Sequence, residues 1–126
     1  MTRVLIVDDR PAFRCLLRPL LTRAGLTVVG EARDIAEAEA QVEALQPDLA
    51  VVDVMLPGVN GLEGTARLKA LAPALRVILV SAYRDQAELF QTAAEEAGAE
   101  AFISKDDLDL EVVRAWTKDP KGFRNP

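Results

Sequence analysis

The sequence of 126 residues contains no histidine and a single cysteine, Cys15. Without imidazole the commonest general base is missing, and every mechanism that pairs a serine or cysteine nucleophile with histidine is excluded. One cysteine excludes an internal disulfide, and the lack of any Cys/His cluster argues against a zinc site. Any chemistry must therefore use carboxylates, hydroxyls, lysine or a bound metal ion.

Basic charge and long hydrophobic runs are also scarce. The chain has 20 acidic and 15 basic residues and a formal net charge of -5, so it lacks the basic surface that nucleic-acid binding normally requires. No apolar run approaches the roughly 18 residues of a membrane span. We therefore expect a cytoplasmic protein that does not enter the membrane and does not bind DNA directly.

Apolar segments of two kinds alternate along the chain. Short, mostly β-branched segments predict strands buried on both faces, at residues 3–7, 26–30, 48–52, 76–80 and 99–104. Between them lie longer segments with apolar positions at helical spacing. At this length we expect a single domain with a flavodoxin-like (βα)5 fold. Its doubly wound parallel sheet would have the strand order 2-1-3-4-5, with a ligand crevice beside strands 1 and 3.

Helix boundaries are marked by proline, glycine and capping residues. Pro11 predicts the start of the first helix, whereas Gly25 and Gly98 predict the ends of the first and fourth helices. The capping-box spacing predicts the starts of the second, third and fourth helices, at Asp34 and Glu37, Asn60 and Glu63, and Asp85 and Glu88. A final helix is expected at about residues 108–118, and the turn-rich segment 119–126 is expected to be a linker stub or a free C-terminal tail.

Polar side chains stand where the predicted strands end. They are Asp8 and Asp9 after strand 1, Asp53 after strand 3, Ser81 after strand 4, and Ser104 and Lys105 at the end of strand 5. The end of strand 2, "GEARD", contributes nothing comparable. Because the carboxyl ends of parallel strands share one edge of the sheet, these carboxylates, hydroxyls and the ammonium group are expected to converge at the crevice.

The charge of this set indicates which ligand it binds. Three aspartates and one lysine sum to -2, which would raise at least one carboxyl pKa unless a cation were bound. Oxygen ligands without His or Cys favour Mg²⁺, with Mn²⁺ tolerated, and Mg²⁺ commonly completes its shell with phosphate oxygens. We therefore expect phosphoryl transfer to Asp53, with Asp8 and Asp9 suited to the metal and Lys105 and Ser81 suited to the phosphoryl oxygens.

Four motifs, each at a strand end, resemble the receiver domain of two-component response regulators. They are "VLIVDDR", "VVDVMLPGVNG", "VILVSA" and "AFISK", and the resemblance covers residues 3–118. It implies that Asp53 accepts a phosphoryl group from a phosphohistidine on a sensor histidine kinase. It also implies that Mg²⁺ is held by Asp8, Asp9, Asp53 and the backbone carbonyl of Met55, and that Lys105 and Ser81 bind the phosphoryl oxygens.

The same resemblance implies a phosphorylation switch. Ser81 and Phe102 would be the switch residues, with Phe102 turning inward behind Ser81 and reshaping the face formed by the fourth helix, the fifth strand and the final helix. A homodimer on phosphorylation is compatible with this switch. The chain would then be a signalling domain that catalyses only its own phosphotransfer and slow dephosphorylation, and not an enzyme with a separate substrate.

Several positions depart from the family's usual pattern. Leu56 stands where the family has methionine, and Asp106 follows Lys105 where it most often has proline, so the loop before the final helix is expected to be more mobile. The Lys-Asp pair resembles the subgroup linked to helix-turn-helix DNA-binding output domains, which implies a transcription regulator that contacts DNA only through a domain absent from this chain. Met55 and Tyr83 are bulky, and we expect them to slow self-dephosphorylation by shielding the phosphoryl group.

Each residue also has a plainer interpretation. The aspartates can be turn formers, Ser81 a loop hydroxyl, Lys105 a solvated surface charge and Phe102 a core residue. Convergence at one edge with compensating charge favours the joint interpretation. Two other function classes stay open: a Mg²⁺-dependent phosphatase, which would need a general-acid aspartate where Met55 stands, and a receiver-shaped interaction module that takes no phosphate.

Overall fold

Five parallel strands form one sheet in the order β2-β1-β3-β4-β5. The computed structural model describes residues 1–117. The strands are β1 (Arg3–Val7), β2 (Thr27–Ala32), β3 (Leu49–Asp53), β4 (Arg76–Ser81) and β5 (Ala101–Ser104). The predicted fold and strand order are therefore confirmed. Strand β2 runs two residues beyond its predicted end because Leu5, Ile6 and Val7 pair with Gly30, Glu31 and Ala32.

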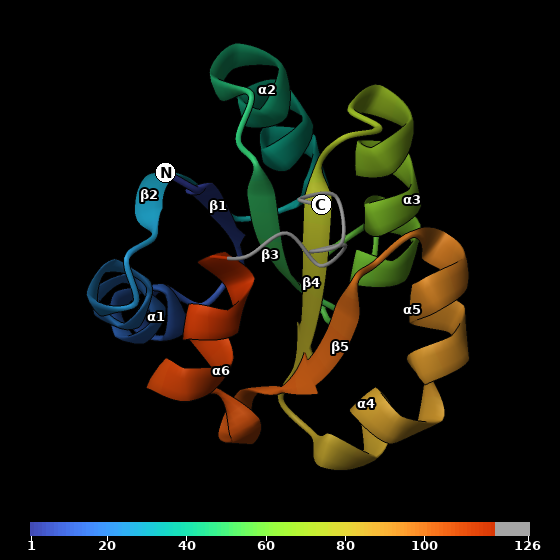
Figure 1. Cartoon of the computed structure of the whole chain (residues 1–126). Helices are drawn as coiled ribbons and strands as arrows, with labels where there is room; N and C mark the ends of the chain where they lie inside the picture. The colour runs from blue at the N-terminus through green and yellow to red at the C-terminus, as the bar shows by residue number, and fades with distance from the viewer. Residues whose placement is uncertain (118–126) are drawn as a thin grey trace, which may run out of the picture.

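Helices cover both faces of this sheet (Figure 1). They are α1 (Pro11–Arg23), α2 (Ile35–Leu45), α3 (Gly61–Leu71), α4 (Arg84–Leu89), α5 (Gln91–Ala97) and α6 (Leu110–Arg114), with short 3₁₀ turns η1 (Lys105–Asp107) and η2 (Ala115–Thr117) beside α6. Alternate residues of β1 enter different cores: Leu5 and Val7 pack with α2, α3 and α5, whereas Val4 and Ile6 pack with α1 and α6. This alternation explains why the strand segments are apolar throughout.

The register of the sheet determines which strand ends meet. Val7 pairs with Val52, so Asp8 follows β1 at the level where Asp53 ends β3. On the other side of β3, Asp53 pairs with Val80, and Ser81 pairs with Ser104. The strands β1, β3, β4 and β5 therefore end at the same level and deliver their polar residues to one edge.

Most of the predicted helix boundaries are confirmed. Pro11 is the first residue of α1, and Gly25 and Gly98 have φ angles of 95° and 100° just after α1 and α5. The side chain of Asp34 accepts a hydrogen bond from the Glu37 N–H at 2.8 Å. Asn60 likewise accepts one from the Glu63 N–H at 2.9 Å. These caps begin α2 and α3 where the sequence predicts them.

Two helix predictions are wrong in detail. The expected fourth helix is divided at Phe90 into α4, which packs on β4 and β5, and α5, which packs on β5 and α3. Helix α4 begins at Arg84, so Asp85 lies in its first turn and not at the predicted cap position. The final helix begins later than predicted, because the Asp109 side chain caps it through the Val112 N–H at 2.8 Å. Residue 118 and the predicted tail 119–126 lie outside the described residues.

We predict that Gly61→Ala destabilises the fold strongly. A Cβ atom at Gly61 would meet the Asp53 carbonyl oxygen and lie 2.6 Å from the Val54 Cα, and backbone atoms cannot rotate away. The free energy of unfolding should fall by about 3 kcal/mol in urea denaturation. Gly64→Ala is the matched control: its Cβ would meet the buried Ile35 side chain, which can shift where backbone atoms cannot, so a smaller loss of about 1 kcal/mol is expected. An equal or smaller loss for Gly61→Ala would contradict this account.

Candidate functional site

Three carboxylates meet at the edge where β1 and β3 end. Ligand oxygens of Asp8, Asp9 and Asp53 all lie within 4.8 Å of one another. The Asp8 and Asp53 side chains are buried, with 1% and 3% of each residue exposed, whereas Asp9 is exposed. The structure thus brings together the predicted acidic residues and leaves the cluster open to solvent on the Asp9 side.

Lys105 supplies the positive charge at this edge. Its Nζ lies 2.9 Å from Asp8 Oδ2 and 3.5 Å from Asp53 Oδ2, and only 13% of its side chain is exposed. Lys105 is therefore a partner of the carboxylates and not a solvated surface charge. Its ammonium also lies 4.0 Å from the centre of the Phe13 ring, a contact that the strand-end motifs do not predict.

Burial dominates the electrostatics of Asp53. Loss of hydration raises the pKa of this carboxyl above its usual 3.8, and the negative charge of Asp8 adds to the increase. A hydrogen bond from the Met55 N–H to Asp53 Oδ1, at 3.1 Å, and the charge of Lys105 oppose the increase without cancelling it. A site with unneutralised negative charge remains, and a cation would stabilise it.

The donor set of the cluster suits a hard divalent cation. Every ligand atom that Asp8, Asp9 and Asp53 offer is a carboxylate oxygen. Three carboxylates are one more than Mg²⁺ commonly uses, but their oxygens are the hard ligands that it prefers, and the exposed Asp9 leaves room for the waters that it commonly keeps. The residues therefore fit Mg²⁺, and the carbonyl of Met55 stays a predicted ligand.

The hydroxyls at the ends of β4 and β5 are engaged with their own loops. Ser81 Oγ donates to the Tyr83 carbonyl at 2.9 Å and accepts from the Tyr83 N–H at 3.1 Å. Ser104 Oγ accepts from the Asp106 N–H at 3.3 Å, within a turn whose peptide bonds are trans. Ser81 is fully buried beside the strand that carries Asp53, so its place at the site agrees with the prediction.

The remaining predicted residues lie around this edge in different environments. Phe102 is already buried, with 5% exposed, so phosphorylation cannot bury it much further, and its switching role stays a prediction. Met55 and Tyr83 follow β3 and β4 and are 59% and 65% exposed. Their loops flank Asp53, and their shielding role also stays a prediction.

The end of β2 adds no residue to the carboxylate cluster, but it supports the site indirectly through Glu31. Glu31 accepts hydrogen bonds from Arg14 Nε at 2.8 Å and Arg18 Nη2 at 2.6 Å, and Arg14 also donates to the backbone carbonyl of Asp8. The Arg18 hydrogen bond is the main cause that lowers the pKa of Glu31, so Glu31 stays ionised. The spacing of four between Arg14 and Arg18 was the available signal, since it places both on one side of α1.

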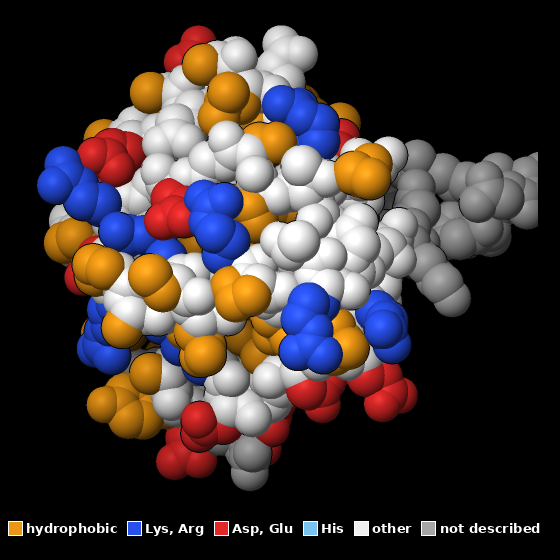
Figure 2. Space-filling view, turned by 90° about the vertical axis from the view of Figure 1, so that its left-hand side faces the viewer, with side chains coloured by type: hydrophobic (Ala, Val, Ile, Leu, Met, Phe, Trp, Pro, Cys, Tyr) orange, Lys and Arg blue, Asp and Glu red, His pale blue; other side chains and the backbone are white. Residues whose placement is uncertain are grey.

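The surface around α1 mixes charges of both signs. On this face of the molecule, Lys and Arg side chains stand among acidic and hydrophobic ones (Figure 2). Some of the basic residues form ion pairs with acidic neighbours, as Arg14 and Arg18 do with Glu31. None of the helices among residues 1–117 has the length and apolar character needed to cross a membrane.

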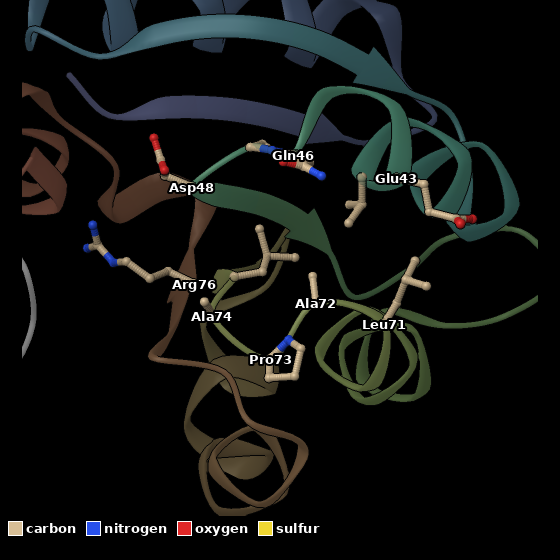
Figure 3. A pocket seen from close by; sticks show the side chains of 11 residues that line it. Glu43, Gln46, Asp48, Leu71, Ala72, Pro73, Ala74 and Arg76 are labelled. Carbon is tan, nitrogen blue, oxygen red and sulfur yellow. The ribbon is translucent and has the colours of Figure 1, made fainter.

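A large hollow lies at the other end of the sheet and is unrelated to this cluster. It is lined by the ends of α2 and α3 and by the segments that lead into β3 and β4, including Gln46, Asp48 and Arg76 (Figure 3). Its volume is about 620 Å³. The whole length of β3 separates Asp48, at the hollow, from Asp53. Convergent chemistry, and not cavity size, therefore identifies the site.

Comparison with known proteins gives consistent matches. The model of the response regulator receiver domain matches residues 4–115. A putative transcriptional regulator of Pseudomonas aeruginosa is 43% identical over 115 residues, which cover 91% of this chain and 55% of that protein. The chemotaxis protein CheY of Thermotoga maritima is 36% identical over 116 residues, which cover 92% of this chain and 95% of that protein.

Solved structures agree with these matches. The signal receiver domain of the putative response regulator NarL from Mycobacterium tuberculosis has a TM-score of 0.82 and 35% identity, and the match covers 96% of this chain and 97% of that domain. The chain spans about half the length of the curated transcriptional regulators that it matches, 55% in two cases.

We predict that Asp53→Asn stabilises the metal-free protein at pH 7. Because the folded-state pKa of Asp53 is raised, its ionised form disfavours the folded state at every pH above that pKa. The gain in free energy of unfolding should shrink as the pH falls through the folded-state pKa toward the usual value of 3.8. Urea denaturation in the presence of a chelator measures this gain. Asp9→Asn, at an exposed residue of the same cluster, is the control and should give a smaller gain. A loss of stability at pH 7 would contradict the electrostatic account.

Proposed function

Because the chain belongs to the response regulator receiver domain family, we propose that it accepts a phosphoryl group on Asp53 from a phosphohistidine of a sensor histidine kinase. The convergence of Asp8, Asp9, Asp53 and Lys105 at one edge of the sheet supports this proposal. In two-component signalling, the phosphorylated receiver then controls an output, here proposed to be transcription. The domain acts on itself and has no separate substrate.

Asp53 is the proposed nucleophile because it ends the central strand with its carboxylate facing the other charges. One of its oxygens forms a bond to phosphorus while the bond between phosphorus and the histidine nitrogen breaks, and the imidazole leaves with the electron pair. The Met55 N–H, which already donates to Asp53 Oδ1 at 3.1 Å, orients the carboxylate. The charge at Asp53 changes from -1 to about -2.

Asp8, Asp9, Asp53 and the carbonyl of Met55 would hold Mg²⁺, or Mn²⁺ with the same oxygen ligands. When bound, the ion supplies positive charge that neutralises the transferring phosphoryl group. Lys105 contributes a second positive charge and needs to move only a short way, since its Nζ is already 3.5 Å from Asp53 Oδ2. Together these charges compensate the added negative charge.

Ser81 is the proposed link between the phosphoryl group and the rest of the molecule. To donate to a phosphoryl oxygen, its hydroxyl must give up the bond to the Tyr83 carbonyl, and the loop leading into α4 would then rearrange. With Phe102, which lies buried on β5, this would alter the face formed by α4, α5, β5 and α6. A new charge that biases a two-state element of this kind is a recurrent switching device.

The output is proposed to be transcription. Matched relatives carry the names "Probable transcriptional regulatory protein NarL" and "DNA-binding transcriptional activator DevR/DosR", and this chain covers 55% and 52% of them. We propose that the receiver works in the cytoplasm with a helix-turn-helix output domain, and that DNA is contacted only by that domain. Homodimerisation on phosphorylation would couple the receiver to the output domain.

Incubation with Mg²⁺ and acetyl phosphate, followed by intact-mass measurement, tests the phosphoacceptor role. We expect a single base-labile phosphoryl adduct that is absent in Asp53→Asn and absent with a chelator. Asp48→Asn, at the opposite end of β3, is the matched control and should be labelled like the wild type. The lack of an adduct would favour an interaction module that takes no phosphate, and rapid turnover of the donor would favour a phosphatase.

Replacement of Met55 and Tyr83 together by serine tests the shielding hypothesis. Removing both bulky side chains should let water reach the phosphoryl group more easily and shorten the lifetime of the adduct several-fold. The decay of the phosphorylated species after donor removal measures this lifetime. Leu89→Ser, an exposed hydrophobic residue of α4, is the control and should leave it unchanged. An unchanged or longer lifetime in the double variant would refute the hypothesis.

A further inference from the structure

The ammonium of Lys105 is held by an aromatic ring as well as by carboxylates. Its Nζ lies 4.0 Å from the centre of the Phe13 ring, well inside the range of about 6 Å in which a cation is attracted to the face of an aromatic ring. Asp8 and Asp53 approach the same ammonium at 2.9 and 3.5 Å. Residues of α1 and β3 and the residue that follows β1 thus place Lys105, which begins η1 just after β5.

Lysine needs such a restraint because its side chain is flexible. It ends four methylenes from the backbone and loses much rotamer entropy when it is fixed. The carboxylates alone are an unreliable restraint, since any cation that neutralises them also weakens their attraction for Lys105. The attraction of the ring arises from its quadrupole and does not depend on the charge of the carboxylates.

The backbone that carries the ring is itself tied to the site. Pro11 begins α1, and the Phe13 N–H donates to the Arg10 carbonyl at 3.1 Å. The next residue, Arg14, donates to both Glu31 and the carbonyl of Asp8, the residue that pairs most closely with Lys105. The position of the ring relative to Asp8 is therefore well determined.

We infer that Phe13 is a positioning residue for phosphoryl transfer, whose ring keeps the Lys105 ammonium at the carboxylate cluster, ready for the phosphoryl oxygens. This inference rests on the proposed function. The competing explanation is that Phe13 only packs, since it is partly buried against the core formed by α1 and α6. The two explanations differ in whether the effect of Phe13 passes through Lys105.

Two variants of Phe13 separate the aromatic ring from hydrophobic bulk. Phe13→Leu keeps an apolar side chain without a π face, and Phe13→Tyr keeps the ring. With saturating Mg²⁺, we expect the initial rate of Asp53 labelling by acetyl phosphate to fall about fivefold in Phe13→Leu and to stay within about twofold of the wild type in Phe13→Tyr. Leu16→Ala, a neighbouring and mostly exposed residue of α1, should leave the rate unchanged.

A double-mutant cycle shows whether the effect passes through Lys105. In a Lys105→Ala background, Phe13→Leu should have no further effect on the labelling rate, whereas a packing role predicts the same fold-change in both backgrounds. NMR of the unphosphorylated protein adds a readout without activity. The ε-methylene protons of Lys105 should be shifted upfield by the ring in the wild type and in Phe13→Tyr, and this shift should be lost in Phe13→Leu.

The outcomes distinguish this inference from the proposed function. If the wild type is labelled on Asp53 but Phe13→Leu is labelled equally fast, the positioning role is wrong and the phosphoacceptor role stands. Equal slowing in both Lys105 backgrounds, or a wild-type Lys105 without the upfield shift, would also overturn the positioning role. If labelling of Lys105→Ala is too slow to measure, the NMR shift and the labelling rates of Phe13→Leu and Phe13→Tyr decide between the positioning role and packing alone. Failure of the wild type itself to form an adduct would refute the proposed function.

Discussion

Two carboxylates buried beside a single ammonium dominate this structure. Asp8 and Asp53 are almost inaccessible to solvent, and Lys105 cannot neutralise both. Burying this uncompensated negative charge costs stability, and it raises the pKa of Asp53. A cation bound at this edge would relieve this unfavourable electrostatic interaction.

Several features of the surrounding structure hold these charges in place. Parallel strands that end at one level deliver Asp8 and Asp53 side by side. Gly61 lets α3 begin directly against the backbone of Asp53 and Val54. On the other side, Glu31 joins two arginines of α1, and one of them reaches the carbonyl of Asp8. Apolar burial on both faces of the sheet provides the stability that offsets the cost of the site.

Features with a local cause could be predicted from the sequence. The strands could be predicted because burial on both faces requires continuous apolar residues. The helix starts at Asp34 and Asn60 could be predicted because a cap needs only a side chain and a backbone N–H three residues away. The cap predicted at Asp85 is wrong, since α4 begins one residue earlier, at Arg84, and Asp85 lies in its first turn. A capping-box spacing alone therefore does not determine where this helix begins.

The sequence by itself determined the fold class, the strand order and the identities of the acidic residues, lysine and hydroxyls at the strand ends, because each depends on periodicity and on the geometry of parallel sheets. Only the tertiary structure decided how these groups pair. Lys105 lies closer to Asp8 than to Asp53, Phe13 covers its ammonium, and Glu31 supports Asp8 through Arg14. These contacts join residues that are distant in sequence, and their distances depend on how helices and strands pack, which no local pattern encodes.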